Sequence, residues 1–234
     1  MDRLPFETFG SQHLLVLAIT FTVFLVIPFL LRNKSNETKY TAGIAIATLI
    51  VVHEITSAFN TFSFDHGWVE AFPLHMCDLS AFSIAYYFWK REKIFFNLAF
   101  FWGIGGATMA LITPDVKFAW PAPEFLPFFY GHGLVLLGVF FACIALKERP
   151  YFSDIHKVVG ITLILMVVIY CINLLLGNGA NFWYLLDRPA GESLMDLFPD
   201  PPYHLLITTP IGIALFYIIY IPLLIKDMFS KNAD

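Results

Sequence analysis

Cys77 and His132 are the side chains whose types and positions best suit nucleophilic catalysis. A cysteine attacks a carbonyl carbon at neutral pH when a neighbouring base takes its proton, and an imidazole is such a base. A carboxylate from Glu54, Asp78 or Asp115 would orient the imidazole and complete the logic of a catalytic triad. These residues therefore predict a site for nucleophilic catalysis, with Cys77, His132 and Asp78 as the catalytic residues.

The candidates for substrate binding are polar residues expected near the depth of Cys77: Glu54, His75, Asp115, Asn181 and Tyr184. Asn181 or Tyr184 would donate a hydrogen bond to the oxyanion that develops when a nucleophile attacks a carbonyl carbon. His75 precedes Cys77 by two positions, so on a helix the two side chains would point about 160° apart. His75 then serves a different wall of the site, unless Pro73 leaves this stretch irregular.

The same residues also have simpler interpretations. A free cysteine in a helix is most often a small buried hydrophobic residue, which is the interpretation we adopt for Cys143 and Cys171. A buried histidine is usually satisfied by packing and hydrogen bonding, and His132 is distinguished by its flanking glycines, Gly131 and Gly133. Zinc or iron would suit four residues: His53, Glu54, His75 and His132. Their spacing matches no dedicated metal motif, so we predict no metal and no cofactor.

The elements that must position these side chains are membrane-spanning helices. The chain has 234 residues, of which 58% are hydrophobic and 14% charged, whereas soluble domains have about 45–50% and about 25%. A spanning helix needs about 20 mostly apolar residues. Seven stretches qualify: 12–32, 41–63, 74–90, 94–113, 125–146, 156–177 and 204–226. We predict one all-α transmembrane domain over residues 1–234, a seven-helix bundle in a lipid bilayer. No basic patch with interleaved aromatic residues indicates nucleic-acid binding.

The charges of the connections predict the direction of the bundle. Eleven of the fourteen Lys and Arg residues fall in alternate connections: near 32–39, 90–93, 147–157 and 226–231. The opposite connections hold Arg3, Lys117 and Arg188. Because basic residues favour the cytoplasmic side of a membrane, this alternation places the N-terminus outside and the C-terminus in the cytoplasm. We expect a multi-pass protein of the cell membrane.

With this direction, the polar residues of the spans gather in their outer halves. Six of the seven histidines are expected there: His13, His53, His66, His75, His132 and His204. Ionisable groups inside a membrane are costly and usually mark a functional site. We therefore predict a polar cavity that opens outward and brings His132 to the depth of Cys77.

The segment Phe72-Pro73-Leu74-His75-Met76-Cys77-Asp78-Leu79 resembles the Leu-Pro-Leu-His-Leu-Cys signature of the YwaF-type bacterial membrane family. Further similar segments follow in the same order: 105–108 with 113–115, 128–133, 181–185, 188–189 and 193–196. Residues 201–203 depart from the Pro-Trp-Pro-Trp-Tyr pattern of that family. The resemblance covers most of residues 70–220. That family is related to the animal transmembrane protein 164, an acyltransferase of ether phospholipids.

The resemblance implies a seven-helix bundle with a cysteine nucleophile at the position of Cys77. His132 carries over as its partner, whereas Asp78 and Asp115 carry over only as motif positions. Together with the outward cavity, the resemblance predicts a membrane acyltransferase or acyl hydrolase that acts on a phospholipid. A lysophospholipid would enter from the outer leaflet as the acyl acceptor, and a second lipid would be the acyl donor.

A small-molecule transporter or receptor is the alternative function. Glu54, Asp78 and His132 would then form a proton relay or line a binding cavity. The sequence shows neither inverted repeats nor paired broken helices, which counts against a common transporter design.

Overall fold

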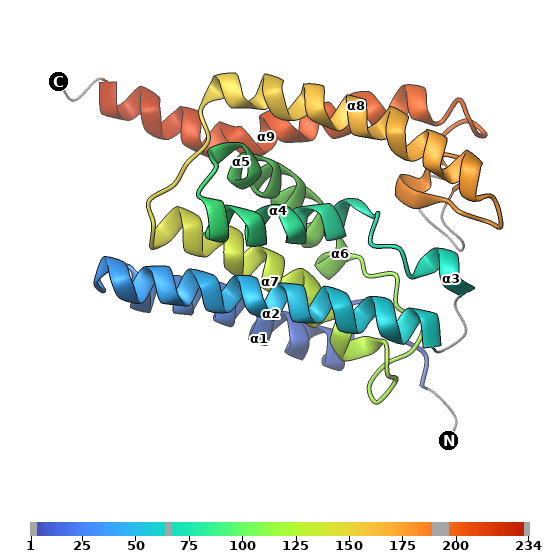
Figure 1. Ribbon diagram of the computed structural model, residues 1–234, viewed down its shortest axis with the longest axis horizontal. Helices are drawn as coiled ribbons and strands as arrows, with labels where there is room; N and C mark the ends of the chain where they lie inside the picture. The colour runs from blue at the N-terminus through green and yellow to red at the C-terminus, as the bar shows by residue number, and fades with distance from the viewer. Residues whose placement is uncertain (1–3, 64–66, 189–196, 232–234) are drawn as a thin grey trace.

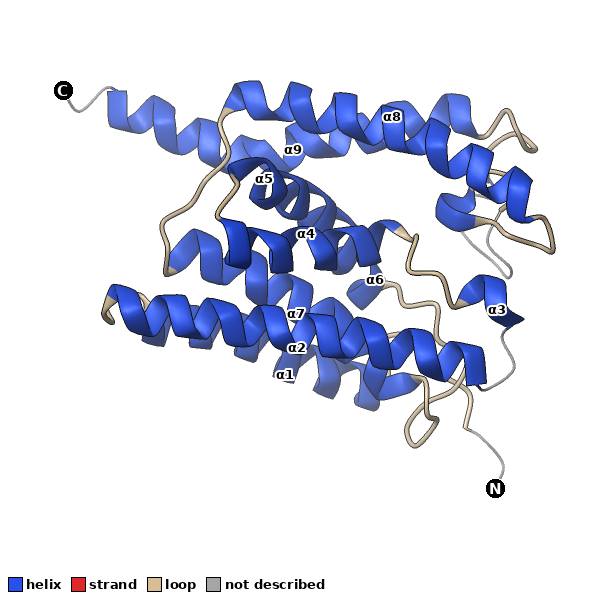
Figure 2. Ribbon diagram, viewed as in Figure 1, coloured by secondary structure: helices blue, strands red, loops and turns tan. Residues whose placement is uncertain are grey.

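The computed structural model describes residues 4–63, 67–188 and 197–231 as a bundle of helices (Figures 1 and 2). The elements are α1 (Ser11–Leu31), α2 (Asn36–Ser63), α3 (Gly67–Glu70), α4 (Met76–Lys90), α5 (Lys93–Trp102), η1 (Gly103–Ala107), α6 (Thr108–Ile112), α7 (Phe125–Ile144), α8 (Phe152–Leu176), η2 (Phe182–Tyr184) and α9 (Leu205–Lys231). The turn η1 is a π-helix and η2 is a 3-10 helix. Within these ranges the chain pairs as a β-bridge at Pro5 and Phe118 and forms no strand. His66 and the motif segments at 189 and 193–196 lie outside the described residues.

Each of the seven expected spans coincides with helix in the structure, which confirms the all-helical membrane architecture. Six segments of the described ranges are long and apolar enough to cross a membrane: α1, α2, the continuous α5–η1–α6 segment, α7, α8 and α9. The α5–η1–α6 segment, Lys93–Ile112, is called the central rod below. The third expected span is α4, which has 15 residues, fewer than the about 20 that a crossing needs. The crossing by α4 and the direction of the termini therefore stay predictions.

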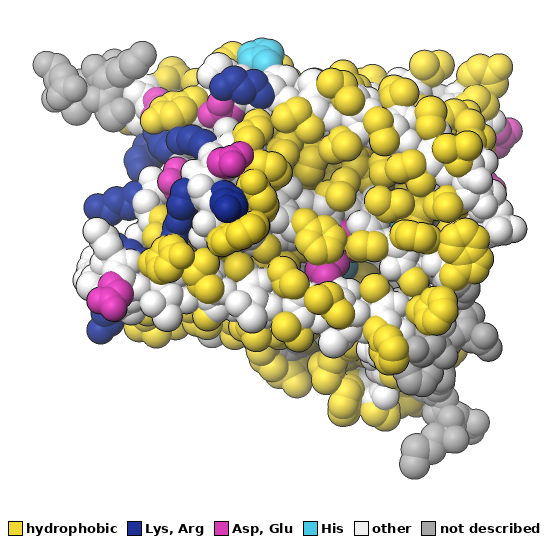
Figure 3. Space-filling view, viewed as in Figure 1, with side chains coloured by type: hydrophobic (Ala, Val, Ile, Leu, Met, Phe, Trp, Pro, Cys, Tyr) yellow, Lys and Arg dark blue, Asp and Glu magenta, His cyan; other side chains and the backbone are white. Residues whose placement is uncertain are grey.

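Consecutive long segments run in opposite directions through the bundle (Figure 1). The beginnings of α1, α4, α7 and α9 and the ends of α2 and α8 therefore lie toward the same end, on the right in Figure 1. Lys and Arg side chains gather at the opposite end, on the left in Figure 3. The candidate site residues are thus held away from the basic end of the molecule.

The core of the bundle is aromatic and lies around the central rod and α7. In the 18-residue apolar windows of these two segments, 61% and 50% of the residues are buried, whereas the share is 11% in α1 and in α9. Fully or almost fully buried phenylalanines fill the space between the helices: Phe24, Phe88, Phe96, Phe101, Phe129 and Phe141. The weakly buried helices present apolar side chains outward, as expected for surfaces that face lipid.

Two glycines let the helices of the core approach closely. A Cβ placed on Gly103 would lie 2.9 Å from a methyl group of Val135, and one on Gly138 would lie 2.8 Å from Ile84. Small residues at such crossings are typical of membrane helices, because close packing is a main attractive force between them. Gly103 and Gly138 are therefore packing glycines.

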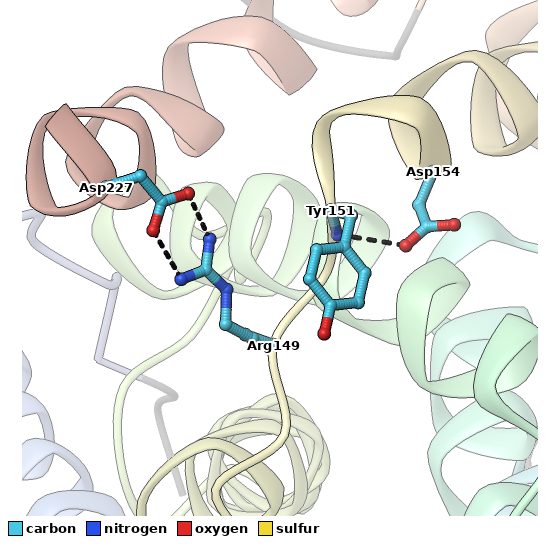
Figure 4. Close-up of polar contacts among 4 residues, drawn as sticks. All are labelled: Arg149, Tyr151, Asp154 and Asp227. Carbon is cyan, nitrogen blue, oxygen red and sulfur yellow. Dashed lines mark hydrogen bonds and ion pairs between the residues drawn. The ribbon is translucent and has the colours of Figure 1, made fainter. Parts of the chain in front are cut away.

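At the basic end, an ion pair joins α9 to the connection before α8. Arg149 donates two hydrogen bonds to the carboxylate of Asp227, at 2.6 Å and 2.5 Å (Figure 4). The Asp227 carboxylate raises the pKa of Arg149 still further above its ordinary value, so the guanidinium stays charged. The same connection leads into α8. At the start of that helix, the Asp154 carboxylate accepts a hydrogen bond from the Tyr151 N–H at 2.9 Å (Figure 4).

Candidate functional site

Cys77 is placed by the way in which α4 begins. Residues 72–75 are not helical, and His75 has the extended backbone of an N-cap, with φ −68° and ψ 156°. Asp78, the third residue of the helix, accepts a hydrogen bond from the His75 N–H at 2.8 Å. A carboxylate here is favourable, because the first N–H groups of a helix lack partners and carry partial positive charge. Cys77 is consequently held as the second residue of α4.

The irregular start of α4 also changes the position expected for His75. The angle of about 160° between His75 and Cys77 applies only when both residues are helical, and His75 precedes the helix. The alternative, that Pro73 leaves this stretch irregular, is what the structure shows. His75 instead packs its ring against Phe182 and Tyr184, with centroid distances of 5.1 Å and 6.4 Å.

The Cys77 thiol lies between the central rod and α2. A Cβ placed on Gly106 of η1 would lie 3.7 Å from the Cys77 Sγ, so a backbone without a side chain borders the sulfur on this side. Glu54 of α2 is close enough to interact electrostatically with both Cys77 and Asp78. The half-buried thiol is therefore within electrostatic range of two carboxyl groups, one from its own helix and one from α2.

The His132 ring is oriented by its own helix. Its Nδ1 lies 2.7 Å from the carbonyl oxygen of Phe128, one turn earlier in α7. A carbonyl oxygen only accepts hydrogen bonds, so Nδ1 carries the hydrogen and Nε2 of the neutral ring is the free acceptor. Sequence analysis assigned the orienting role to a carboxylate, and in the structure the Phe128 carbonyl occupies that position on the ring.

His53 is also part of this site, although the sequence analysis named it only as a possible metal ligand. Its ring lies against the backbone of Gly131, where any side chain would collide with it. It also packs edge-on to Tyr130, with the ring centroids 5.5 Å apart, and interacts electrostatically with His132. The sequence did contain a sign of this arrangement in the adjacent polar residues His53 and Glu54. Neighbouring side chains on a helix point about 100° apart, so the two residues contact two different helices.

The site thus draws one group of side chains from three mutually packed helices: α2, α4 and α7. His53 faces α7 and Glu54 faces α4. Among the described residues there is no hydrogen bond between the Cys77 thiol and the His132 ring. Catalytic hydrogen bonds are often long before substrate binds, so the pairing of Cys77 with His132 stays a prediction.

A loop that includes η2 covers the beginning of α4. The Trp183 indole N–H donates to the Leu74 carbonyl at 2.9 Å, and His204 Nε2 lies 2.8 Å from the Tyr184 carbonyl oxygen. Trp183 and Tyr184 both have positive φ angles, 60° and 53°. Large residues rarely adopt this conformation, and strained backbone concentrates at functional sites. The loop is therefore held in an unfavourable conformation directly above His75.

Asn181 has its amide engaged within this loop. Its Oδ1 accepts hydrogen bonds from the N–H groups of Leu186 and Asp187, at 3.0 Å and 3.1 Å. Its Nδ2 donates to the Asp187 carbonyl at 2.9 Å. The side chain thus holds the shape of the loop, and donation to a substrate would require it to give up one of these bonds.

The remaining candidates lie outside the three-helix group. Asp115 is exposed in the connection after α6. His13 is fully buried, accepts a hydrogen bond from the Phe9 N–H, and lies 2.8 Å from the Leu111 carbonyl oxygen, which is a packing role. Within the described ranges, no three His, Cys, Asp or Glu side chains are arranged to hold a metal ion.

Comparison with known proteins agrees with the resemblance seen in the motifs. The model of the TMEM164 family matches residues 8–220. An uncharacterized protein of Treponema pallidum (strain Nichols) is 28% identical over 224 residues, which cover 93% of this chain and 90% of that protein. No solved structure matches the chain.

Proposed function

Because this chain belongs to the TMEM164 family, we propose that it is a membrane-embedded lipid acyltransferase or acyl hydrolase with Cys77 as its nucleophile. His132 is the general base. The observation that carries this proposal is the hydrogen bond from His132 Nδ1 to the Phe128 carbonyl, which leaves Nε2 as a proton acceptor. An oriented imidazole on α7 and a thiol on the adjacent α4 are the parts that acyl transfer through a thioester requires.

In the first half-reaction, Cys77 attacks the carbonyl carbon of a phospholipid acyl ester. His132 Nε2 takes the thiol proton while the bond from sulfur to carbon forms. The tetrahedral intermediate then collapses, the ester C–O bond breaks, and His132 returns the proton to the departing lysophospholipid oxygen. The acyl group remains on Cys77 as a thioester, and the step needs neither an oxidant nor a cofactor.

The second half-reaction moves the acyl group to its acceptor. The hydroxyl of a lysophospholipid attacks the thioester carbonyl, and His132 takes the hydroxyl proton. The bond from carbon to sulfur breaks, and the proton passes to the Cys77 sulfur. Water in place of the lysophospholipid makes the same steps a hydrolysis, so the class of acceptor decides between transferase and hydrolase.

The beginning of α4 supports this chemistry beyond holding the thiol. In an α-helix the first N–H groups have no partner within the helix, and those of Met76 and Cys77 belong to this first turn. Backbone N–H groups at a helix N-terminus are suitable donors to an oxyanion. They replace Asn181 as the first choice for this role, because its amide is engaged in the loop.

The proposal includes the placement of the protein. The chain crosses the cell membrane seven times with α4 as the third crossing, the N-terminus outside and the C-terminus in the cytoplasm. The gathering of Lys and Arg at one end of the bundle supports this direction (Figure 3). The site then lies in the outer half of the membrane, where phospholipid headgroups and ester groups are near. Reporter fusions at the two termini test the direction.

The test of the chemistry is capture of the acyl-enzyme. The purified protein in lipid nanodiscs is incubated with a phospholipid that carries a labelled acyl chain, and labelled peptides are identified by mass spectrometry. We expect a hydroxylamine-sensitive label on Cys77, absent from Cys77→Ala. Cys143→Ala and Cys171→Ala are the matched controls and should keep both label and turnover. Unchanged turnover in Cys77→Ala would overturn the proposal.

A proton-coupled transporter or receptor is the second candidate, and one observation favours it. The carboxyl groups of Glu54 and Asp78 interact with each other inside the helical bundle, and paired ionisable groups within a membrane are typical of proton relays. Uptake driven by a pH gradient in proteoliposomes, unaffected by Cys77→Ala and lost in Glu54→Gln, would select this function over acyl transfer.

A further inference from the structure

A groove runs along the outside of the bundle between the central rod and α9. It has a volume of about 220 Å³ and is lined by Ile104, Gly105, Thr108 and Met109 of the rod and by Leu215 and Ile219 of α9. The polar side-chain groups of its lining are the hydroxyls of Thr108 and Thr113. The Thr113 hydroxyl donates a hydrogen bond to the Met109 carbonyl at the end of α6. The lining suits a hydrocarbon chain and offers nothing to bind a charged headgroup.

The groove is continuous with the surface that the protein presents to lipid. Met109 on its edge is 60% exposed, and Ile112 is exposed as well. Both walls belong to segments that are long and apolar enough to cross a membrane. Lipid acyl chains are therefore the molecules that reach the groove without leaving the bilayer.

One residue step along the chain separates the lining of the groove from the backbone that borders the Cys77 thiol. Gly105 borders the groove, and a Cβ placed on it would lie 3.3 Å from Leu215. The next residue, Gly106, borders the Cys77 Sγ. Between the groove and the sulfur, this part of η1 thus presents backbone without side chains. A π-helical turn at this position agrees with the frequent occurrence of such turns at functional sites.

We propose that this groove holds the acyl chain of the lipid that reacts at Cys77. This inference rests on the proposed acyl transfer and adds where the substrate binds. The chain lies against Ile104 and Ile219, and its carbonyl end passes over Gly105 and Gly106 to reach the sulfur. The length of the groove then limits the length of the acyl chain that is accepted, and side chains of α9 set this limit.

The first test fills the groove from the α9 side. In Ile219→Trp the larger side chain occupies space that the end of a long acyl chain needs. We expect the rate with a long-chain phospholipid, relative to a short-chain one, to fall by about tenfold or more. The matched control is Ile218→Trp, because Ile218 is the neighbouring residue and is 58% exposed on the outside of α9. This variant should keep the chain-length preference of the wild type.

The second test reads binding without turnover. A phospholipid with a photoactivatable group at the end of its acyl chain is bound to Cys77→Ala in nanodiscs and cross-linked. We expect labelled peptides from residues 104–113 and 215–219, and loss of this label in Cys77→Ala combined with Ile219→Trp. Label spread evenly over the outward faces of α1 and α8 would overturn the proposal that the groove binds the acyl chain.

The two proposals fail in different ways. Acyl transfer is wrong if Cys77→Ala keeps its turnover. The proposal that the groove binds the acyl chain is wrong if Cys77→Ala abolishes turnover while Ile219→Trp keeps both the wild-type chain-length preference and the wild-type cross-links.

Discussion

The carbonyl oxygen of Phe128 holds the imidazole of His132 through a hydrogen bond of 2.7 Å to Nδ1. In a catalytic triad a carboxylate performs this task, fixing both the tautomer and the orientation of the ring. Here one turn of α7 performs it, since a carbonyl oxygen also requires a hydrogen on Nδ1. The proposed base would therefore be built from a single helix, and α4 would have only to bring the thiol within reach of Nε2.

Replacing His132 should remove catalysis without unfolding the protein. General acid–base catalysis contributes about 10²–10⁴-fold, so we expect His132→Ala to lose acyl transfer by this factor while its helical circular dichroism stays unchanged. His156→Ala is the control, because His156 is exposed on α8 near the basic end. Activity of His132→Ala close to that of the wild type would contradict a role as base.

Gly131 should matter because it makes room for His53. A methyl group at this position would collide with the His53 ring, which interacts electrostatically with His132, and displacement of the proposed base by about 1 Å would cost up to about 10²-fold in rate. We expect Gly131→Ala to lower the rate of acyl transfer within this range. Gly160→Ala is the matched control in α8, since a Cβ there would meet nothing within 4 Å.

A double variant separates this steric effect from a general loss of packing. If Gly131→Ala acts by displacing His53, then adding it to His53→Ala should lower the rate no further, because coupled residues are not additive. Independent, additive losses in the double variant would show that Gly131 acts on something other than His53.

His13 should affect stability rather than chemistry. It is fully buried and contacts the Phe9 N–H and the Leu111 carbonyl through its two ring nitrogens. His13→Leu would leave both groups without these partners, and we expect a loss of about 2 kcal/mol in the free energy of unfolding. Denaturant titration in detergent measures it, with Leu14→Ala at an exposed neighbouring position as the control. A large loss of turnover in the folded fraction would indicate a catalytic role instead.

The loop over α4 should open when its indole hydrogen bond is removed. Trp183→Phe keeps an aromatic ring but cannot donate to the Leu74 carbonyl. We expect about 1 kcal/mol less local stability, seen as faster hydrogen exchange at residues 180–188. Trp120→Phe, at an exposed position in another connection, is the control. Equal exchange in the two variants would show that the Trp183 hydrogen bond does not hold the loop.

The pair of Arg149 and Asp227 should stabilise the basic end without affecting the site. Both side chains are partly exposed, at 28% and 37%, so solvent screens their attraction and we expect about 1 kcal/mol from a double-mutant cycle. Acyl transfer by Arg149→Ala should remain near the wild-type rate. A selective loss of long-chain substrates would instead tie this end of α9 to the groove.

Hydropathy and length predicted all the long helices of this protein. Spans of about 20 apolar residues leave few alternatives in a bilayer, because the backbone must satisfy its own hydrogen bonds there. The exact start of α4 was not predicted, because it depends on the cap formed by His75 and Asp78. The π-helical turn at 103–107 was not predicted either, since nothing in the composition of a helix reveals one extra residue in a turn.

The helices that carry the candidate site residues were predicted, whereas the arrangement of those residues was predicted only in part. The sequence by itself determined that Cys77, Glu54 and His132 would lie in apolar helices, where polar groups mark function. Only the tertiary structure decided that Gly106 borders the thiol, that His53 rests on Gly131, and that the His132 ring is held by its own helix. The physical reason is that hydropathy sets which residues enter the membrane, whereas the rotation of each helix about its axis is set by side-chain packing between segments distant in sequence.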